Sequence, residues 1–224
     1  DSSSNRSTDT RPTPVRDSKY RPYMFGYPDG TFRPERQVSR AELASVLART
    51  VLQTTGTDAT VPMQPTFRDV ETTHWAFEAI ERGAAAGLLR GYGDGTFRPE
   101  QAVTRAELAA VVSKLLSQST TNQTAEPTET PSTTFTSNPV FTDIADHWGR
   151  ESIIKTVEAG IMTGYGDGSF RPDEKLTRAE LVVVMNRLLG ISSLPNSTPR
   201  WADVNRAHWA FGAIQAASAE VEEK

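Results

Sequence analysis

Apolar positions follow a helical period in two kinds of segment that recur along the chain. The first kind begins at a Ser/Thr-Arg-Ala-Glu tetrad and continues as an apolar run, such as Leu108, Val111 and Val112 after Thr104. Spacings of three and four residues place such side chains on one face of a helix. The equivalent run after Thr177 is apolar on most faces, and a helix of that kind requires burial. These segments are predicted to be inner helices that supply much of the core.

A second predicted helix starts at each of three His-Trp pairs. After Trp75, one apolar face is marked by Ala76, Ile80, Gly83 and Ala84. Each pair is preceded by Phe-x-Asp or Trp-x-Asp, and an Ile follows each Trp by five positions. The small residues on this face favour close packing against another helix.

A nine-residue block, Gly-Tyr-x-Asp-Gly-x-Phe-Arg-Pro, leads to each tetrad. Its three copies, called turn blocks below, are Gly26–Pro34, Gly91–Pro99 and Gly164–Pro172. Asp-Gly favours a turn with positive φ, and the Phe is expected to enter the core. Pro28 stands where the other copies have Gly, so that middle position does not require positive φ. Faithful recurrence of this kind indicates one supersecondary unit used several times.

The order of these motifs is a half unit, two whole units and a closing half unit. We therefore predict an all-α fold of three helix–loop–helix repeats closed into a ring, in which the N- and C-terminal halves complete one unit. Residues 1–19 are predicted to be a flexible linker and residues 20–224 a single domain. Its units are 20–52 with 200–224, 66–117 and 140–190. The Thr- and Pro-rich connectors between them are interpreted as linkers, with O-glycosylation as an alternative.

Each tetrad is predicted to form a capping box. In that arrangement the Thr104 hydroxyl accepts the N–H of Glu107, and the Glu107 carboxylate accepts the N–H of Thr104. The predicted capping residues are Ser39, Glu42, Thr104, Glu107, Thr177 and Glu180.

A capping box does not need the Arg at the second position of the tetrad. A cation near the positive end of a helix is mildly unfavourable. The recurrence of this Arg at positions 40, 105 and 178 favours an anion site beside free helix N–H groups. The alternative is a surface salt bridge to a neighbouring unit. If the role is binding, Arg105→Ala should leave the melting temperature almost unchanged, whereas Thr104→Ala should cost about 1 kcal/mol.

Composition narrows the possible chemistry. The net charge of −4 over 224 residues lacks the basic footprint of nucleic-acid binding. The absence of cysteine excludes disulfides and thiolate metal sites. No apolar run reaches the 18 residues or more that indicate a membrane span.

Catalysis and metal binding are not favoured either. The three histidines each stand beside a Trp at one repeat position, whereas a catalytic site needs unlike residues converging once. The Gly-rich turn blocks lack the Lys-Ser/Thr of a phosphate-binding loop and the ligand number of a calcium loop. We predict structural histidines, no enzyme activity, no cofactor and no metal.

These motifs, in this order, resemble the S-layer homology family over about Tyr23–Lys224 apart from the connectors. The resemblance implies a pseudo-threefold, three-pronged helical spindle with binding grooves between adjacent units. It also implies non-covalent anchoring of an exported protein to a secondary cell-wall polysaccharide bearing pyruvylated N-acetylmannosamine. The expected location is the bacterial cell wall, outside the cell, as a monomeric module of a larger surface protein.

The resemblance also implies roles for individual residues. The residues expected to contact the pyruvyl carboxylate are Arg40, Arg105 and Arg178. Those expected to shape the sugar-facing loops are Asp29, Gly30, Asp94, Gly95, Asp167 and Gly168. Those expected to wall the grooves, or the core beside them, are Trp75, Trp148 and Trp209. Three departures from the family pattern, at Ser39, Gly149 and Trp201, leave open which grooves bind.

A function of another class stays open: a self-assembling structural module that makes lattice contacts of the S-layer type. Binding of wall polymer would favour anchoring, whereas concentration-dependent oligomers without polymer would favour self-assembly. A glycan hydrolase is disfavoured because paired inward carboxylates are not evident in the sequence.

Overall fold

The computed structural model describes residues 22–54, 64–121 and 141–219. Across these ranges it contains seven helices and one pair of two-residue strands, so the all-α class is confirmed. None of the helices in these ranges is long and apolar enough to cross a membrane. The predicted linker 1–19, most of the two longer connectors and residues 220–224 lie outside the described residues.

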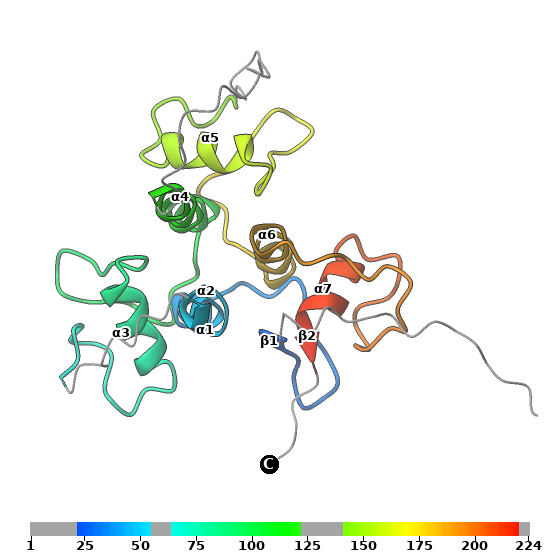
Figure 1. The fold of residues 1–224 in the computed structure, drawn as a ribbon, viewed down its shortest axis with the longest axis horizontal. Coiled ribbons are helices and arrows are strands. Elements are labelled where there is room, and N and C mark those ends of the chain that lie inside the picture. The colour runs from blue at the N-terminus through cyan, green and yellow to red at the C-terminus, as the bar shows by residue number, and fades with distance from the viewer. Residues whose placement is uncertain (1–21, 55–63, 122–140, 220–224) are drawn as a thin grey trace, which may run out of the picture.

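Three inner helices occupy the centre of the molecule and three outer helices lie around them (Figure 1). The inner helices are α1 (Arg40–Arg49), α4 (Arg105–Thr121) and α6 (Arg178–Leu189), and the short α2 (Val51–Thr54) follows α1. The outer helices are α3 (Phe77–Ala85), α5 (Arg150–Glu158) and α7 (Phe211–Ala217). Helix α3 packs against α1, α5 against α4, and α7 against α6. Each outer helix therefore covers the inner helix that precedes it in the chain, and successive sequence units interlock.

The core combines the inner helices with one Phe from each turn block. Leu108 of α4 and Leu181 of α6 are completely buried, and so are Phe32, Phe97 and Phe170. The predicted insertion of the turn-block Phe into the core is confirmed.

Local polar contacts define where the helices start and end. Ser39 and Glu42 form a capping box at α1, in which the Glu42 carboxylate accepts the Ser39 N–H at 2.8 Å. The same pair of contacts occurs at α6 and at the start of α4. Helix α6 ends at Gly190 in the left-handed conformation, which suits a glycine C-cap. At the outer helices, the Nδ1 of a His accepts the backbone N–H two residues ahead, as His74 does from Ala76.

The turn blocks contain a strained residue that the sequence does not predict. Besides their glycines, Arg33, Arg98 and Arg171 have positive φ angles of 56°, 58° and 56°. The Asp of the Phe-x-Asp motif stabilises this backbone, because Asp69 accepts the N–H groups of Phe97 and Arg98, both at 2.7 Å. Hydrogen bonds to an ionised carboxylate are strong, and a left-handed non-glycine residue persists only where its surroundings fix it.

A cycle of backbone hydrogen bonds joins the three units near the starts of the inner helices. The N–H of Val38 donates to the carbonyl of Leu176 at 2.9 Å, Leu176 to Val103 at 2.8 Å, and Val103 to Val38 at 2.9 Å. The tetrad Arg of each unit also donates its backbone N–H to a carbonyl of another unit, as Arg40 does to Gln101 at 2.9 Å. The N-termini of α1 and α4 are thus bonded to the next unit in sequence order, and that of α6 to the first unit.

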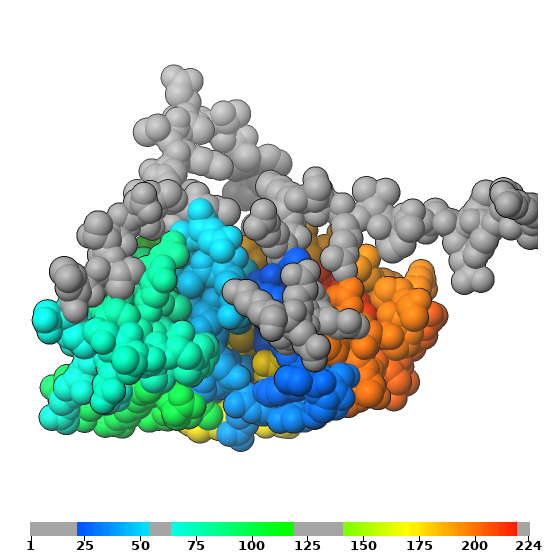
Figure 2. All heavy atoms as spheres, turned by 90° about the horizontal axis from the view of Figure 1, so that it is seen from below, coloured from blue at the N-terminus to red at the C-terminus, as the bar shows by residue number. Residues whose placement is uncertain are grey.

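The first and last described segments lie side by side (Figures 1 and 2). Strand β1 (Met24–Phe25) pairs in parallel with β2 (Ser218–Ala219). Asp203 accepts the N–H groups of Phe32 and Arg33 at 2.8 and 2.7 Å, the contact that Asp69 makes within its own unit. The C-terminal half therefore provides the N-terminal turn block with the carboxylate that Asp69 and Asp143 provide in the other two units.

The buried hydroxyl of Tyr23 adds a side-chain link between the two ends. It lies 2.7 Å from Oδ1 of Asn186 on α6, and Nδ2 of the same Asn186 donates to the carbonyl of Ala213 on α7 at 2.9 Å. Burial raises the pKa of Tyr23 above its ordinary value, so the hydroxyl keeps its proton and can donate. One amide side chain thereby connects the N-terminal segment to the last helix.

Candidate functional site

Two cavities lie between neighbouring units and have equivalent linings. The first groove, of about 420 Å³, is lined by Arg40, Tyr92, Glu107, Lys114 and Trp148 among others. The second groove, of about 280 Å³, is lined by the corresponding Arg105, Tyr165, Glu180, Arg187 and Trp209. The two linings share two cations, one carboxylate, one Tyr and one Trp, and the first groove adds Arg90. A few charged groups set among apolar and aromatic ones are typical of sites that bind small molecules.

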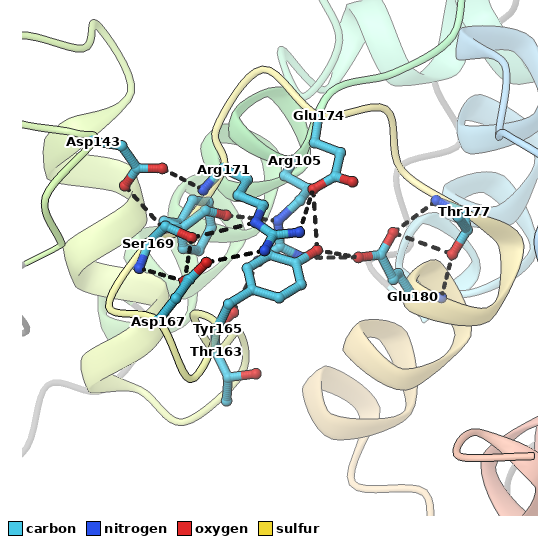
Figure 3. Close-up of polar contacts among 11 residues, drawn as sticks. Arg105, Asp143, Thr163, Tyr165, Asp167, Ser169, Arg171, Glu174, Thr177 and Glu180 are labelled. Carbon is cyan, nitrogen blue, oxygen red and sulfur yellow. Dashed lines mark hydrogen bonds and ion pairs between the residues drawn. The ribbon is translucent and has the colours of Figure 1, made fainter.

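The tetrad Arg reaches from the start of one inner helix into the next unit (Figure 3). In the second groove, Nε of Arg105 donates to the carbonyl of Phe170 at 2.9 Å and Nη2 to that of Thr163 at 2.8 Å. Its Nη1 lies 3.0 Å from the Glu180 carboxylate. A guanidinium has five N–H donors, so these three bonds leave two for a ligand. Arg105 is largely buried, with 5% of its surface exposed.

The other two tetrad arginines repeat these contacts. Nε of Arg40 donates to Phe97 at 2.7 Å, and Nε of Arg178 donates to Phe32 at 2.9 Å. The distances to the capping Glu of the next unit are 3.5 Å for Arg40 and 4.0 Å for Arg178. The inter-unit salt bridge that the sequence left as an alternative is therefore present, but it is largely buried.

The helix N–H groups expected to be free beside these arginines are occupied, which corrects the sequence interpretation. The N–H groups of Arg40 and Ala41 donate to carbonyls of the next unit, both at 2.9 Å. That of Glu42 donates to the Ser39 hydroxyl at 3.2 Å. Each unit thus provides hydrogen-bond acceptors for the helix N-terminus of a neighbouring unit. The sequence of one motif does not show this, because the acceptors lie in another unit. An anion in the groove would meet side chains and not helix N–H groups.

The Tyr of each turn block organises the charged groups around it. The guanidinium carbons of Arg171 and Arg105 lie 4.0 and 4.9 Å from the ring centre of Tyr165. Its hydroxyl lies 3.3 Å from both Glu174 and Glu180. Burial raises the pKa of Tyr165, so the phenol stays neutral and can donate a hydrogen bond. This Tyr is a groove residue that the sequence motifs did not single out.

A second cation per groove was also missed. Lys114 and Arg187 each stand nine positions after the tetrad Arg of their helix, and Arg49 is their counterpart on α1. Nη1 of Arg187 donates to the carbonyl of Ile161 at 3.3 Å, and Nζ of Lys114 donates to that of Gly87. A basic residue recurring at one repeat position was the available sequence signal.

The three tryptophans are exposed at equivalent positions. Trp75, Trp148 and Trp209 are 62%, 66% and 63% exposed, so they do not belong to the core. The ring centre of Trp148 lies 5.3 Å from that of His147, and Nε2 of His147 lies 3.3 Å from Asp173. The His-Trp pair thus holds an aromatic face at the cavity wall.

The Asp-Gly pairs of the turn blocks lie away from the two cavities. Asp94, Gly95, Asp167 and Gly168 line neither groove. Asp94 instead accepts the N–H and hydroxyl of Thr96 at 3.0 and 2.6 Å and lies 3.2 Å from Nη2 of Arg98. Asp29 and Asp167 make the same local contacts. These residues shape the loop that carries the groove-lining Tyr.

Comparison with known proteins shows which family shares this repeated sequence pattern. The sequence model of the S-layer homology domain matches residues 20–44, 66–109 and 140–182. Cell surface glycoprotein 1 of Acetivibrio thermocellus is 40% identical over 88% of this chain, and the cellulosome-anchoring protein of that organism is 34% identical over 86%. The S-layer protein sap of Bacillus anthracis is 25% identical over 64% of it.

The chain spans only 8%, 41% and 16% of the lengths of these three relatives. The similarity therefore concerns one module that occurs in otherwise different proteins. The family match covers the turn blocks, the tetrads and two of the three His-Trp motifs. These segments provide the tetrad Arg, the Tyr and the Glu of both grooves, whereas Lys114, Arg187 and Trp209 lie outside them. The chain belongs to the S-layer homology domain family.

Proposed function

We propose that this chain anchors the protein that carries it to a bacterial cell wall, outside the cell, by binding a secondary cell-wall polysaccharide in the grooves between its repeats. The names of two relatives, a cell surface glycoprotein and a cellulosome-anchoring protein, support this assignment. The observation that carries it is the lining of the two grooves, where two cations and an exposed Trp recur at matching positions.

The mixed charge of the lining favours a sugar that bears a single carboxylate. Two cations attract an anion, while the Glu of each groove would repel a densely charged ligand and can accept a sugar hydroxyl. A pyruvylated N-acetylmannosamine unit combines one carboxylate with hydroxyl groups and a ring that can pack on the Trp. Binding at more than one groove along a single polymer would strengthen attachment by avidity.

We also propose that the module has no catalysis of its own. The carboxylates in the grooves are already committed to capping boxes and to inter-unit salt bridges, as Glu180 is to Thr177 and Arg105. A general acid or base needs a reacting group at hydrogen-bonding distance. In both grooves the carboxylate instead makes the same contacts, to the helix cap and to the tetrad Arg.

The test is a titration with purified wall polymer, with and without its pyruvyl groups. Removing the pyruvyl group should weaken binding by about 1.5–3 kcal/mol per occupied groove, the scale of a hydrogen bond to a charged group. Binding should also weaken as salt is raised, because exposed charges are screened. Equal affinity for both polymers would show that the carboxylate is not recognised, and recognition would then rest on the sugar ring.

A matched pair of variants separates groove chemistry from net charge. Arg187→Gln removes a cation that lines the second groove, whereas Arg150→Gln removes an exposed cation on α5 that lines neither groove. Only the first should weaken polymer binding. If the protein instead forms concentration-dependent oligomers without polymer, a lattice-forming role is favoured.

A further inference from the structure

The third interface between units, called the third groove below, differs from the interfaces that hold the first and second grooves. Its equivalent residues are Arg178, Tyr27, Glu42, Arg49 and Trp75. A cavity of about 240 Å³ along α1 and α3 is lined by Arg49 and Trp75, but its lining does not include the other three. In the first and second grooves, one cavity joins all five positions. This cavity therefore covers only the outer part of the third groove, beside Arg49 and Trp75.

The residue before each turn block differs between the three units. That residue is Arg90 at the first groove, Thr163 at the second and Phe25 at the third. Its carbonyl accepts Nη2 of a tetrad Arg in every unit, at 2.5, 2.8 and 2.7 Å respectively. The backbone is thus equivalent, so the side chain leaves it at the same point of each groove.

Phe25 occupies this point with a rigid apolar ring, 38% exposed. Thr163 places only a small polar side chain there. Arg90 is exposed and lines its groove, and a long charged side chain can keep its guanidinium in water. Phe25 has no such freedom, because a phenyl ring offers two rotatable bonds and avoids water.

Phe25 also engages the second cation of its groove. The guanidinium carbon of Arg49 lies 5.0 Å from the Phe25 ring centre, while Nη1 donates to the carbonyl of Tyr23 at 3.3 Å. A guanidinium within about 6 Å of an aromatic ring is attracted to its face. Arg187 makes the matching bond to Ile161, but its neighbour at the groove is Thr163. Arg49 therefore contacts the Phe25 ring beside the outer cavity, whereas Arg187 stands beside Thr163 in the second groove.

We propose that Phe25 closes the third groove to the anionic sugar, so that this chain carries two competent grooves. The inference rests on the proposed function, because it concerns the same ligand. It makes the residue before the turn block the one that decides whether a groove binds. Exchanging that residue between units should move the binding capacity with it.

The experiment counts binding sites by calorimetry with a defined probe, the methyl glycoside of pyruvylated N-acetylmannosamine. The unaltered chain should bind two equivalents. Phe25→Thr, which installs the residue of the second groove, should bind three. Thr163→Phe, the reverse exchange, should bind one. Adding Arg49→Gln to Phe25→Thr should weaken the third site selectively, because the opened groove then keeps only Arg178 of its two cations.

Three equivalents for the unaltered chain would overturn the inference and leave the proposed function standing. Two equivalents for Phe25→Thr would do the same, provided that its thermal unfolding matches the parent. Phe25→Ala serves as a second opening variant if Phe25→Thr melts early. Absence of binding in every variant would overturn the proposed ligand, and the inference with it.

Discussion

Arg105 combines a buried contact between two units with a place in the lining of the second groove. Its buried guanidinium holds the following unit through two carbonyls and Glu180, and it also lines the second groove. Removing it leaves the carbonyls of Phe170 and Thr163 without their donors. Loss of a buried hydrogen-bond partner is expensive because the remaining group is not rehydrated.

We therefore predict that Arg105→Ala lowers the free energy of unfolding by at least the roughly 1.5–3 kcal/mol of one hydrogen bond to a charged group. Urea unfolding would measure this against Thr104→Ala, which removes a cap at a cost of about 1 kcal/mol. The sequence alone suggested that Arg105→Ala would spare stability. That earlier expectation would be restored if Arg105→Ala unfolded at the same urea concentration as the parent.

At the scale of elements, the turn block is a self-contained electrostatic unit. Thr96 donates its hydroxyl and N–H to Asp94, and Arg98 adds an ion pair. These contacts lower the pKa of Asp94 from 3.8 to about 2, with the Thr96 hydroxyl as the largest cause. Asp29 and Asp167 have pKa values lowered to about 2 for the same reasons. The loop keeps its charge pattern well into the acid range.

The lowered pKa of Asp94 determines the direction in which stability changes with pH. The stabilisation from ionised Asp94 is fully present above about pH 3.8 and is lost as the pH falls through about 2. Asp94→Asn should therefore be less stable than the parent at neutral pH, and the gap should narrow between about pH 4 and pH 2. Urea midpoints measured across that range give the test. A gap independent of pH would show that the carboxylate charge contributes nothing.

The elements that sequence reasoning identified correctly are those encoded locally. Capping boxes, the Gly190 helix end and the buried Phe of each turn block depend on residues within one motif. The pairing of α3 with α1 depends on the packing of two different units and could not be read from either alone. The second cation of the groove was missed for a related reason, since Lys114 acquires meaning only beside a cavity that neighbouring units form.

At the scale of the whole molecule, the two ends of the described chain depend on each other. Asp203 supports the backbone of Phe32 and Arg33, and Asn186 joins Tyr23 to α7. We propose that these contacts make the three units one cooperative domain. Neither half unit can bury its own apolar face, because each lacks the segment that the other provides.

Deleting Trp201–Lys224 should consequently lower stability and broaden the unfolding of everything that remains. The removed segment includes α7 and Asp203, so α6 loses its cover and the N-terminal turn block loses its acceptor. Calorimetric melting of the truncated and full chains would measure both effects. A truncated protein that melts at the same temperature, and as sharply, would contradict the dependence of the two ends.

The cycle of backbone hydrogen bonds through Val38, Leu176 and Val103 has a consequence for the evolution of such a chain by repeat duplication. In an open stack of repeats, a duplicated unit adds to a free end. Here the N–H of Val38 in the first unit already donates to Leu176 in the third, so an additional copy would have no free end on which to dock. Binding capacity can then change only by divergence of the three existing copies, one position at a time. The different residues at positions 25, 90 and 163 are divergence of that kind.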